Sequence, residues 1–143
     1  MSGAELTLYF DGKCPFCRAG MDKLARWDRA RRLAFVDIAA PGFDPAHLGV
    51  DMAALNRELH SQTRDGRVLV GVDSLLRSYT LAGQAWRVLP LRVPGLRSVC
   101  SWSYRLFARH RYLMSRVLGY RVGYRAPACA DGVCERPNPF FKR

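Results

Sequence analysis

Two cysteines separated by two residues are the part of this chain best suited to chemistry. Cys14 and Cys17 follow an apolar run at 6–10, which predicts a strand, and Pro15 predicts the first turn of a helix. Cys14 would stand at the helix start, where unpaired N–H groups and the helix dipole favour a thiolate over a thiol. The spacing also brings the two sulfurs within reach of a disulfide. We therefore predict a redox dithiol in which Cys14 attacks as the nucleophile and Cys17 resolves.

The residues beside the two cysteines have roles that follow from their chemistry. Lys13 adds a positive charge that favours the Cys14 thiolate, and Phe16 shields the cysteines and offers an apolar face to a partner. Asp11 allows two interpretations. Its carboxylate could take a proton from Cys17 during resolution, or its side chain could cap the turn that opens the helix. The residues alone leave both roles open.

The remaining cysteines allow other uses of the motif. A pair separated by two residues is also half of many zinc sites, which need a second pair of ligands. Four residues separate Cys129 from Cys134, a wider spacing than zinc knuckles use. These two thiols could form a second redox pair, a structural disulfide or a weak metal clip, or stay unlinked. We predict redox chemistry at Cys14 and Cys17, an inert buried thiol at Cys100, and neither a metal nor a cofactor.

The elements that must position the cysteines form a strand, helix, strand unit. Apolar residues three and four apart predict a helix over residues 14–31, and a second buried strand follows at 33–38. Two such strands pair in parallel through a right-handed crossover. Asp65-Gly66 then predicts the turn between the strands of an antiparallel hairpin, 59–63 and 67–70. Together these elements predict an α/β fold with a four-stranded mixed sheet flanked by helices.

Two short helices are expected on either side of the hairpin in sequence. Asp51 is predicted to cap a helix over 52–59, because its side chain can accept from the first free N–H groups. Asp73 or Ser74 is predicted to cap a second helix over 75–82 for the same reason. Both helices would add to the layers that cover the sheet.

Helical periodicity returns in the C-terminal part of the chain. After a proline-containing connector at 88–95, apolar residues recur at helical spacing from 96 to 118. This pattern predicts the longest helix, with a basic second face and with His110 on the apolar face as a hydrogen-bonded core residue. We therefore divide the chain into a domain over residues 1–126, including this helical extension, and an irregular cysteine-containing tail over 127–143.

Composition and charge narrow the function classes. Apolar residues make up 49% of the chain and charged residues 24%, which is typical of a globular domain. The formal net charge is +11, but no zinc finger, helix-turn-helix or RNA-binding motif accompanies it, so specific nucleic-acid binding is not expected. The odd number of cysteines, five, and the lack of a signal peptide or a transmembrane run predict a soluble cytoplasmic protein. Peripheral contact with a membrane surface is an alternative use of the basic helix.

The motif and its surroundings resemble a known family. The segment from Tyr9 to Cys17 resembles the DCC family of predicted thiol-disulfide oxidoreductases, which is named for an aspartate and two cysteines. Asp11, Cys14 and Cys17 match those three residues. The resemblance covers most of the chain, from Leu6 to about Cys134, and includes Asp28, 35–38, 65–68 with Gly71, and Tyr104 followed by 108–112.

This resemblance implies a thioredoxin-like fold and dithiol/disulfide exchange with a protein or low-molecular-weight disulfide, with a dithiol as electron donor. Thioredoxins carry a cis-proline before the first hairpin strand, where the backbone receives an extended substrate chain. Residues 57–60 contain no proline, so this docking route is not predicted here. His60 is expected to be a surface or helix-end residue. Two other function classes stay open: a non-catalytic binding module with a basic helix for an acidic partner, and a zinc-binding protein.

Overall fold

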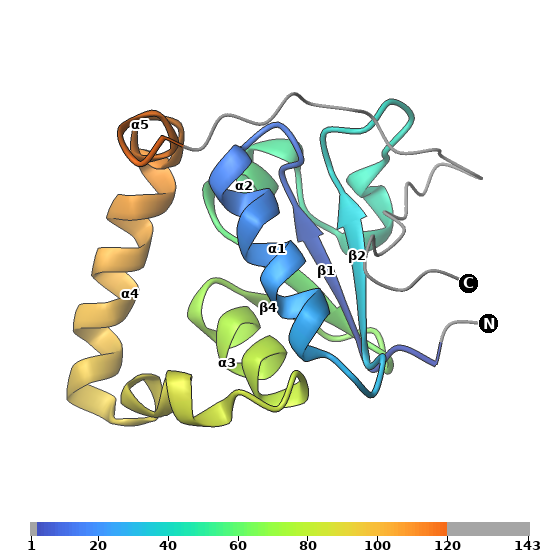
Figure 1. The fold of residues 1–143 in the computed structure, drawn as a ribbon. Coiled ribbons are helices and arrows are strands. Elements are labelled where there is room, and N and C mark those ends of the chain that lie inside the picture. Colours follow the sequence, from blue (N-terminus) through green and yellow to red (C-terminus); the bar gives the residue numbers. More distant parts are fainter. Residues whose placement is uncertain (1–2, 120–143) are drawn as a thin grey trace.

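A computed structural model of the chain describes residues 3–119 and contains the predicted mixed sheet (Figure 1). The strand order is β2-β1-β3-β4. β1 (Leu6–Phe10) pairs in parallel with β2 (Leu33–Asp37) and antiparallel with β3 (His60–Thr63), which pairs in turn with β4 (Val68–Val70). The α/β fold class is therefore confirmed, and it is consistent with a thioredoxin-like architecture.

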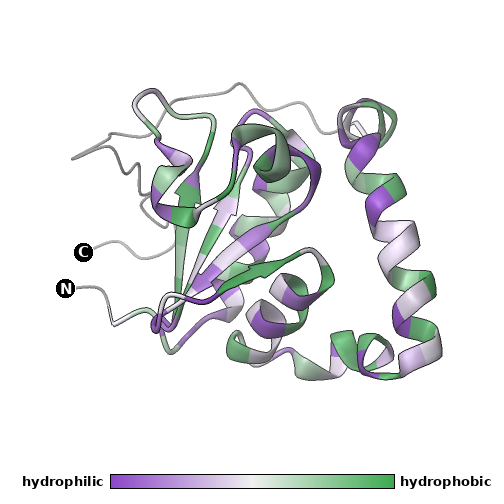
Figure 2. Ribbon diagram, turned by 180° about the vertical axis from the view of Figure 1, so that it is seen from behind, coloured by the Kyte–Doolittle hydropathy of each residue, from purple (hydrophilic) through white to green (hydrophobic). Residues whose placement is uncertain are grey.

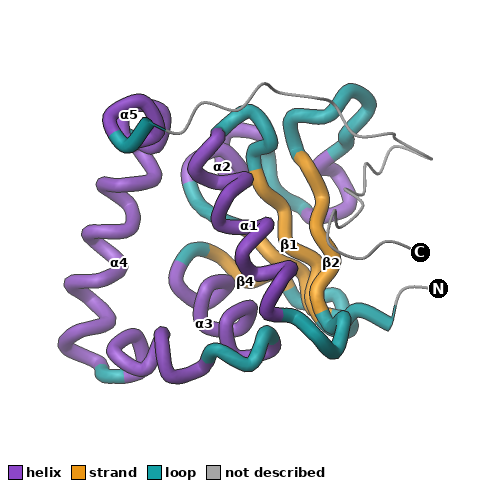
Figure 3. The backbone as a smooth tube through the Cα atoms, in the orientation of Figure 1, coloured by secondary structure: helices purple, strands orange, loops and turns teal. Residues whose placement is uncertain are grey.

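Helices cover both faces of this sheet (Figure 3). One core cluster joins β1 and β2 to two of the helices, α1 and α3. A second cluster on the opposite face joins the same strands to a 3-10 turn, η1, and to α2. The helical elements are α1 (Pro15–Trp27), η1 (Pro45–Leu48), α2 (Met52–Arg57), α3 (Val72–Leu81), η2 (Ala85–Arg92), α4 (Pro94–Arg109) and α5 (Arg111–Val117).

β1 is the central strand and is buried on both faces. Leu8 and Phe10 belong to the cluster under α1, and Tyr9 between them belongs to the cluster under α2, as the alternation of a strand requires. β2 is hydrophobic along most of its length, whereas β3 is polar (Figure 2). The end of β1 therefore places the following turn, and with it the cysteines, at a fixed point above the core.

Several element boundaries differ from those predicted. α1 ends at Trp27, not Arg31, because the Asp28 carboxylate accepts from the backbone N–H groups of Arg32, at 3.0 Å, and Leu33, at 2.8 Å. These bonds turn the chain out of the helix and into β2. The Asp51 cap is confirmed by a 2.7 Å bond from the Ala54 N–H, but the helix that follows ends at Arg57.

The predicted start of the helix after the hairpin is also wrong. α3 begins at Val72, with Gly71 at its N-cap position, so that Asp73 lies in the first turn and caps nothing. The Ser74 hydroxyl instead donates to the Leu69 carbonyl at 2.8 Å and accepts from the Ser61 hydroxyl at 2.9 Å. Both side chains are buried, so these bonds tie α3 to the hairpin rather than cap the helix.

The C-terminal helix is divided in two, contrary to the single helix predicted over 96–118. α4 ends at Arg109, and α5 begins at Arg111, so that His110 is the joint between them and is exposed rather than part of the core. The connector before α4 is a 3-10 helix, η2, which includes Pro90. α4 runs along one side of the domain, and α5 packs against α1 (Figure 1).

Two single-residue predictions are corrected as well. His60 is buried at the start of β3, where its Nδ1 lies 2.9 Å from the Glu58 carbonyl, because the side chain of this strand position faces the interior. Cys100 is a free thiol that is half-buried rather than fully buried, because α4 leaves part of its surface open. Cys129, Cys134 and the predicted tail over 127–143 lie outside the described residues. No helix among residues 3–119 is long and apolar enough to cross a membrane.

Candidate redox site

Cys14 and Cys17 form a disulfide at the start of α1, with their Cα atoms 5.2 Å apart. Cys14 is the N-cap residue, Pro15 follows in the first helical turn, and the Cys14 sulfur accepts a hydrogen bond from the Cys17 N–H at 3.3 Å. Cys14 has 0% of its surface exposed, whereas Cys17 is partly exposed. The two sulfurs therefore differ in which one a reagent can reach.

The turn before α1 depends on a close approach between Gly12 and Asp37. The Gly12 N–H donates to the Asp37 carboxylate at 2.8 Å, and this carboxylate also accepts from the Ala39 N–H at 2.9 Å. A Cβ atom on Gly12 would overlap the Asp37 side chain. Glycine at this position therefore lets the end of β2 hold the backbone that leads into Cys14.

The Asp11 carboxylate is buried and uses both of its oxygens. Oδ1 accepts from the Lys13 N–H at 2.9 Å, which is the geometry of a turn cap. Oδ2 accepts from the Arg111 guanidinium at 3.0 Å and from the Tyr112 hydroxyl. Burial, followed by the hydrogen bond to Asp11, raises the pKa of Tyr112, so the phenol stays protonated as a donor.

α5 is held over Cys14 by contacts from one side of the helix. The Ser115 hydroxyl oxygen accepts from the Phe16 N–H at 3.3 Å and lies 3.9 Å from the Cys14 sulfur, so its own O–H can be directed at that sulfur. Arg111 on the same helix also donates to the Asn56 side chain at 3.2 Å. The Arg111–Asp11 pair is nearly buried, with 11% and 3% of the side chains exposed. α5 therefore covers Cys14 and is fixed by a desolvated ion pair.

Ser115 and Arg111 are the site residues that sequence reasoning missed. The segment 108–112, which includes Arg111, belongs to the resemblance, but its position beside the cysteines was not predicted. The spacing of four residues between Arg111 and Ser115 places them on one face of a helix, and this is the signal that could have paired them.

α4 is tied to the segment that precedes β3. The Leu59 N–H donates to the Tyr104 hydroxyl at 2.8 Å, and Arg105 forms an ion pair with Glu58 at 3.3 Å. Burial raises the pKa of Tyr104. Residues 57–60, in this segment, lack the proline that thioredoxins carry before the first hairpin strand, and the Leu59 N–H already donates to Tyr104.

A cleft of about 450 Å³ lies between α1 and α4, and Cys17 is in its wall. Cys14 is not among the residues that line it. The Phe16 ring packs edge-on against Phe107, with ring centroids 4.7 Å apart, and both residues line the cleft beside Cys17. Most of the lining is apolar or aromatic, including Phe16, Met21, Leu24, Tyr79, Tyr104 and Phe107.

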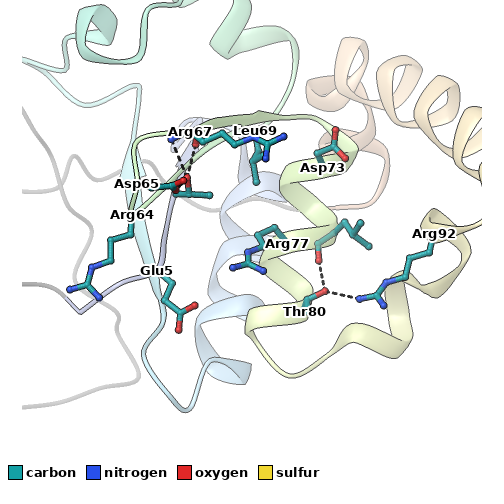
Figure 4. A pocket seen from close by; sticks show the side chains of 11 residues that line it. Glu5, Arg64, Asp65, Arg67, Leu69, Asp73, Arg77, Thr80 and Arg92 are labelled. Atoms are coloured by element: carbon teal, nitrogen blue, oxygen red, sulfur yellow. Dashed lines mark hydrogen bonds between the residues drawn. The ribbon is translucent and has the colours of Figure 1, made fainter.

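A second hollow, of about 900 Å³, lies between the hairpin and α3 and has no cysteine in its lining (Figure 4). Arg64, Arg67 and Arg77 line it, and within residues 3–119 their guanidinium groups have no hydrogen bond or ion pair. The Thr63 hydroxyl donates to the Asp65 carboxylate. This bond, then a backbone hydrogen bond, and then the charges of Arg67 and Arg77 lower the pKa of Asp65. Glu5, Asp65 and Asp73 also line the hollow, so four arginines and three carboxylates meet on this surface, which is separate from the redox site.

The structure brings most of the predicted site residues together at the turn between β1 and α1. They are Asp11, Lys13, Cys14, Pro15, Phe16 and Cys17. Lys13 is exposed beside the turn. Within residues 3–119, no three His, Cys, Asp or Glu side chains are grouped so that they could hold a metal ion. Within residues 3–119 the site therefore consists of a disulfide with a polar support, and Cys129 and Cys134, the possible second pair, lie outside the described residues.

Comparison with known proteins places this arrangement in a family. Residues 8–117 match the model of the DCC1-like thiol-disulfide oxidoreductases. The chain belongs to this family. An uncharacterized chloroplastic protein of Arabidopsis thaliana is 25% identical over 109 residues, which are 75% of this chain and 51% of that protein. The chain therefore spans about half the length of this curated relative. No solved structure matches the chain.

Proposed function

We propose that this DCC1-like chain is an enzyme that exchanges the Cys14–Cys17 dithiol and disulfide with thiol or disulfide substrates. The observation that carries the proposal is the disulfide at the N-terminus of a 13-residue helix, where the Cys17 N–H points at the Cys14 sulfur. A thiolate released at this position gains a hydrogen bond and the positive end of the helix dipole. Exchange requires such a stabilised thiolate, because the thiolate is both the nucleophile and the leaving group.

The exchange is tested with hydroxyethyl disulfide as substrate and dithiothreitol as electron donor. We expect the protein to accelerate the reduction of hydroxyethyl disulfide, and we expect the double variant Cys14→Ser, Cys17→Ser to abolish this acceleration. Cys100→Ser is the matched control, because Cys100 is a free thiol on α4 outside the site. A protein that gives no acceleration, or a double variant as active as the wild type, would contradict the proposal.

The second candidate function is a non-catalytic module that binds an acidic partner. The arginines of the hollow favour it, since Arg64, Arg67 and Arg77 line one surface and their guanidinium groups form no hydrogen bond or ion pair within residues 3–119. Such a module would keep its affinity for an acidic partner in the Cys14→Ser variant and would lose it as salt is added. Acceleration of disulfide exchange by the wild type separates the two functions.

A further inference from the structure

We propose that the substrate reaches the disulfide through the cleft between α1 and α4, at Cys17, and is a low-molecular-weight thiol or disulfide that carries an apolar group. This inference rests on the proposed exchange function and deepens it. It assigns the mixed disulfide to Cys17, whereas the sequence-based prediction assigns the attack to Cys14. The two assignments name different sulfurs and can be separated by experiment.

Access to the sulfurs decides between them. Cys14 has 0% exposure and lies under α5, beside Ser115. Cys17 is partly exposed and forms part of the cleft wall. A reagent in the cleft therefore meets Cys17 first, without any displacement of α5.

The chemistry of the leaving group favours the same sulfur. When Cys17 is attacked, Cys14 must leave as a thiolate, and a leaving thiol that ionises readily leaves faster. The Cys17 N–H, at 3.3 Å, and the N-terminus of α1 stabilise negative charge on Cys14. The Ser115 hydroxyl, at 3.9 Å from the sulfur, adds a donor. Cys14 is thus suited to leave and Cys17 to be attacked.

Contacts of α4 with the segment before β3 favour a small substrate over an extended peptide. An extended peptide that docked before β3 would need backbone groups of that segment. The Leu59 N–H already donates to the Tyr104 hydroxyl at 2.8 Å, and Glu58 pairs with Arg105 of α4. Tyr104 and Arg105 of α4 therefore occupy the segment at which an extended peptide would dock, whereas the cleft beside Cys17 has room for a small molecule.

The apolar part of the cleft lining favours an apolar substituent. Met21 and Leu24 of α1 and Phe107 and Tyr104 of α4 line a volume of about 450 Å³, which is in the range of ligand pockets. Charged residues also line the cleft, including Asp22, Lys23, Arg26, Arg57, Glu58 and Arg111. Gly20 also lines the cleft, and a Cβ atom there would meet nothing within 4 Å. The space beside α1 is therefore open, and a benzyl-sized group can be buried next to Cys17.

The reaction balances in atoms and electrons. A substrate thiolate attacks the Cys17 sulfur, the Cys14–Cys17 bond breaks, and Cys14 leaves with the electron pair of that bond. A second substrate thiolate then attacks the substrate sulfur of the mixed disulfide, and the Cys17 thiolate that is released takes a proton from water. Two thiols are thereby oxidised to one disulfide, and the cysteine pair is reduced to a dithiol. The reverse sequence reduces a substrate disulfide through the same intermediate at Cys17.

The first test compares benzyl mercaptan with 2-mercaptoethanol, two monothiols of similar acidity, as reductants of the Cys14–Cys17 disulfide. Each rate is divided by the rate of the same thiol with hydroxyethyl disulfide in free solution. We expect a preference of about tenfold for benzyl mercaptan, which corresponds to about 1.4 kcal/mol. Gly20→Leu fills the cleft and should reduce this preference to about twofold or less, a difference of about 1 kcal/mol. Ser98→Leu adds the same side chain to an exposed position of α4 outside the cleft and should keep the preference.

The outcomes distinguish the inference from the function on which it rests. If neither thiol reduces the protein faster than it reduces hydroxyethyl disulfide, the proposed exchange function itself fails. Equal acceleration by both thiols, or a preference that Gly20→Leu leaves intact, would keep the exchange function and overturn the apolar cleft.

The second test locates the mixed disulfide. Cys14→Ser and Cys17→Ser variants are incubated with dibenzyl disulfide, and the adduct is mapped by mass spectrometry of peptides. We expect a benzylthio adduct on Cys17 in the first variant and at least tenfold less adduct on Cys14 in the second. Circular dichroism of both variants confirms that they are folded. Faster modification of Cys14 than of Cys17 would overturn the inference and support Cys14 as the attacking residue.

Discussion

The sulfur of Cys14 depends on a small number of donors, because it has no exposed surface. Burial alone favours the neutral thiol, since the charged form loses its hydration. The Cys17 N–H and the Ser115 hydroxyl replace part of that hydration, at 3.3 and 3.9 Å from the sulfur. The thiolate of the reduced protein is therefore sensitive to the loss of either donor.

Removing the Ser115 hydroxyl should make thiolate formation at Cys14 harder. The test uses reduced protein in which the other four cysteines are replaced by serine. We expect Ser115→Ala to raise the pH midpoint of Cys14 thiolate formation by about one unit, because a hydrogen bond to a charged group contributes about 1.5–3 kcal/mol. The ultraviolet absorbance of the thiolate during a pH titration measures this midpoint. Ser98→Ala, on the exposed side of α4, is the control. A midpoint that Ser115→Ala does not move would show that the hydroxyl does not stabilise the thiolate.

Gly12 supports the same sulfur through the backbone. Gly12→Ala should lower the free energy of unfolding by about 3 kcal/mol or more, because the new Cβ overlaps the Asp37 carboxylate that holds the turn. Gly20→Ala is the matched control, since its Cβ meets nothing within 4 Å and alanine favours a helix interior by about 0.5–1 kcal/mol. Urea denaturation followed by circular dichroism measures both values. A Gly12→Ala variant as stable as Gly20→Ala would show that the turn can relax.

Sequence reasoning identifies Asp11, Cys14 and Cys17 because they lie within seven residues of one another at the end of a recognisable strand. Ser115 and Arg111 could not be found in the same way. Arg111 is 100 residues from its partner Asp11, and no local pattern relates positions so far apart. Their place in the site is set by the path of the chain through α4.

At the level of elements, the division between α4 and α5 gives the site its cover. The apolar periodicity over 96–118 is the same for one straight helix as for two helices, and neither glycine nor proline stands at the joint, His110. The sequence therefore could not show the break. Arg111 and Ser115 contact the turn between β1 and α1, and these contacts hold α5 at an angle to α4. They are tertiary contacts, which local periodicity does not reveal.

The Arg111–Asp11 pair should hold α5 over Cys14. Arg111→Met leaves the buried Asp11 carboxylate without its cation. We expect the free energy of unfolding to fall by about 3 kcal/mol, which is near the lower end of the losses measured when one partner of a buried ion pair is removed. The loss is at that end because the Tyr112 hydroxyl and the Lys13 N–H still donate to the carboxylate. In the reduced protein, alkylation of Cys14 should become at least about tenfold faster, in line with the free energy lost. Arg116→Met, an exposed position of α5, is the control. Unchanged alkylation of Cys14 by iodoacetamide in Arg111→Met would show that the pair does not fix this helix.

The hydrogen bond between Tyr104 of α4 and Leu59, just before β3, should affect the stability of the protein at alkaline pH. Burial raises the pKa of Tyr104 above its usual value of about 10, so the folded state keeps the phenol proton that the unfolded state loses. Its contribution to stability is therefore complete below about pH 10 and is lost as the pH rises through the folded-state pKa. Tyr104→Phe should cost about 1–3 kcal/mol at neutral pH, because the Leu59 N–H loses its acceptor. The difference from the wild type should shrink above about pH 10, as measured by urea denaturation at several pH values. Other tyrosines titrate equally in both proteins, so a constant difference would contradict this role.

At the scale of the whole molecule, the sequence predicts the fold more completely than it predicts the site. The mixed sheet follows from local signals, since the strand, helix, strand unit and the Asp65-Gly66 hairpin each lie within a short stretch of chain. The distribution of charge could not be predicted in the same way. The sequence predicts a helix with a basic second face, yet Arg97, Arg105 and Arg111 each form an ion pair with an acidic residue elsewhere in the chain. Arg64, Arg67 and Arg77 of the hollow form no ion pair within residues 3–119, and the Asp65 carboxylate is the acidic group on which the charges of Arg67 and Arg77 act.

This difference predicts where a polyanion binds the molecule. Removal of three charges from the hollow, as Arg64→Gln, Arg67→Gln and Arg77→Gln, should lower the salt concentration at which the protein elutes from heparin. The same number of charges removed from α4, as Arg97→Gln, Arg105→Gln and Arg109→Gln, should lower it less, because two of those arginines already face a carboxylate at close range. Both triple variants have the same net charge, so net charge alone predicts equal elution. Equal elution, or a larger effect of the α4 variant, would show that the basic helix and not the hollow binds the polyanion. The rate of exchange with uncharged 2-mercaptoethanol is the control. It should be unchanged in the hollow variant, because none of the three substituted residues lines the cleft at Cys17.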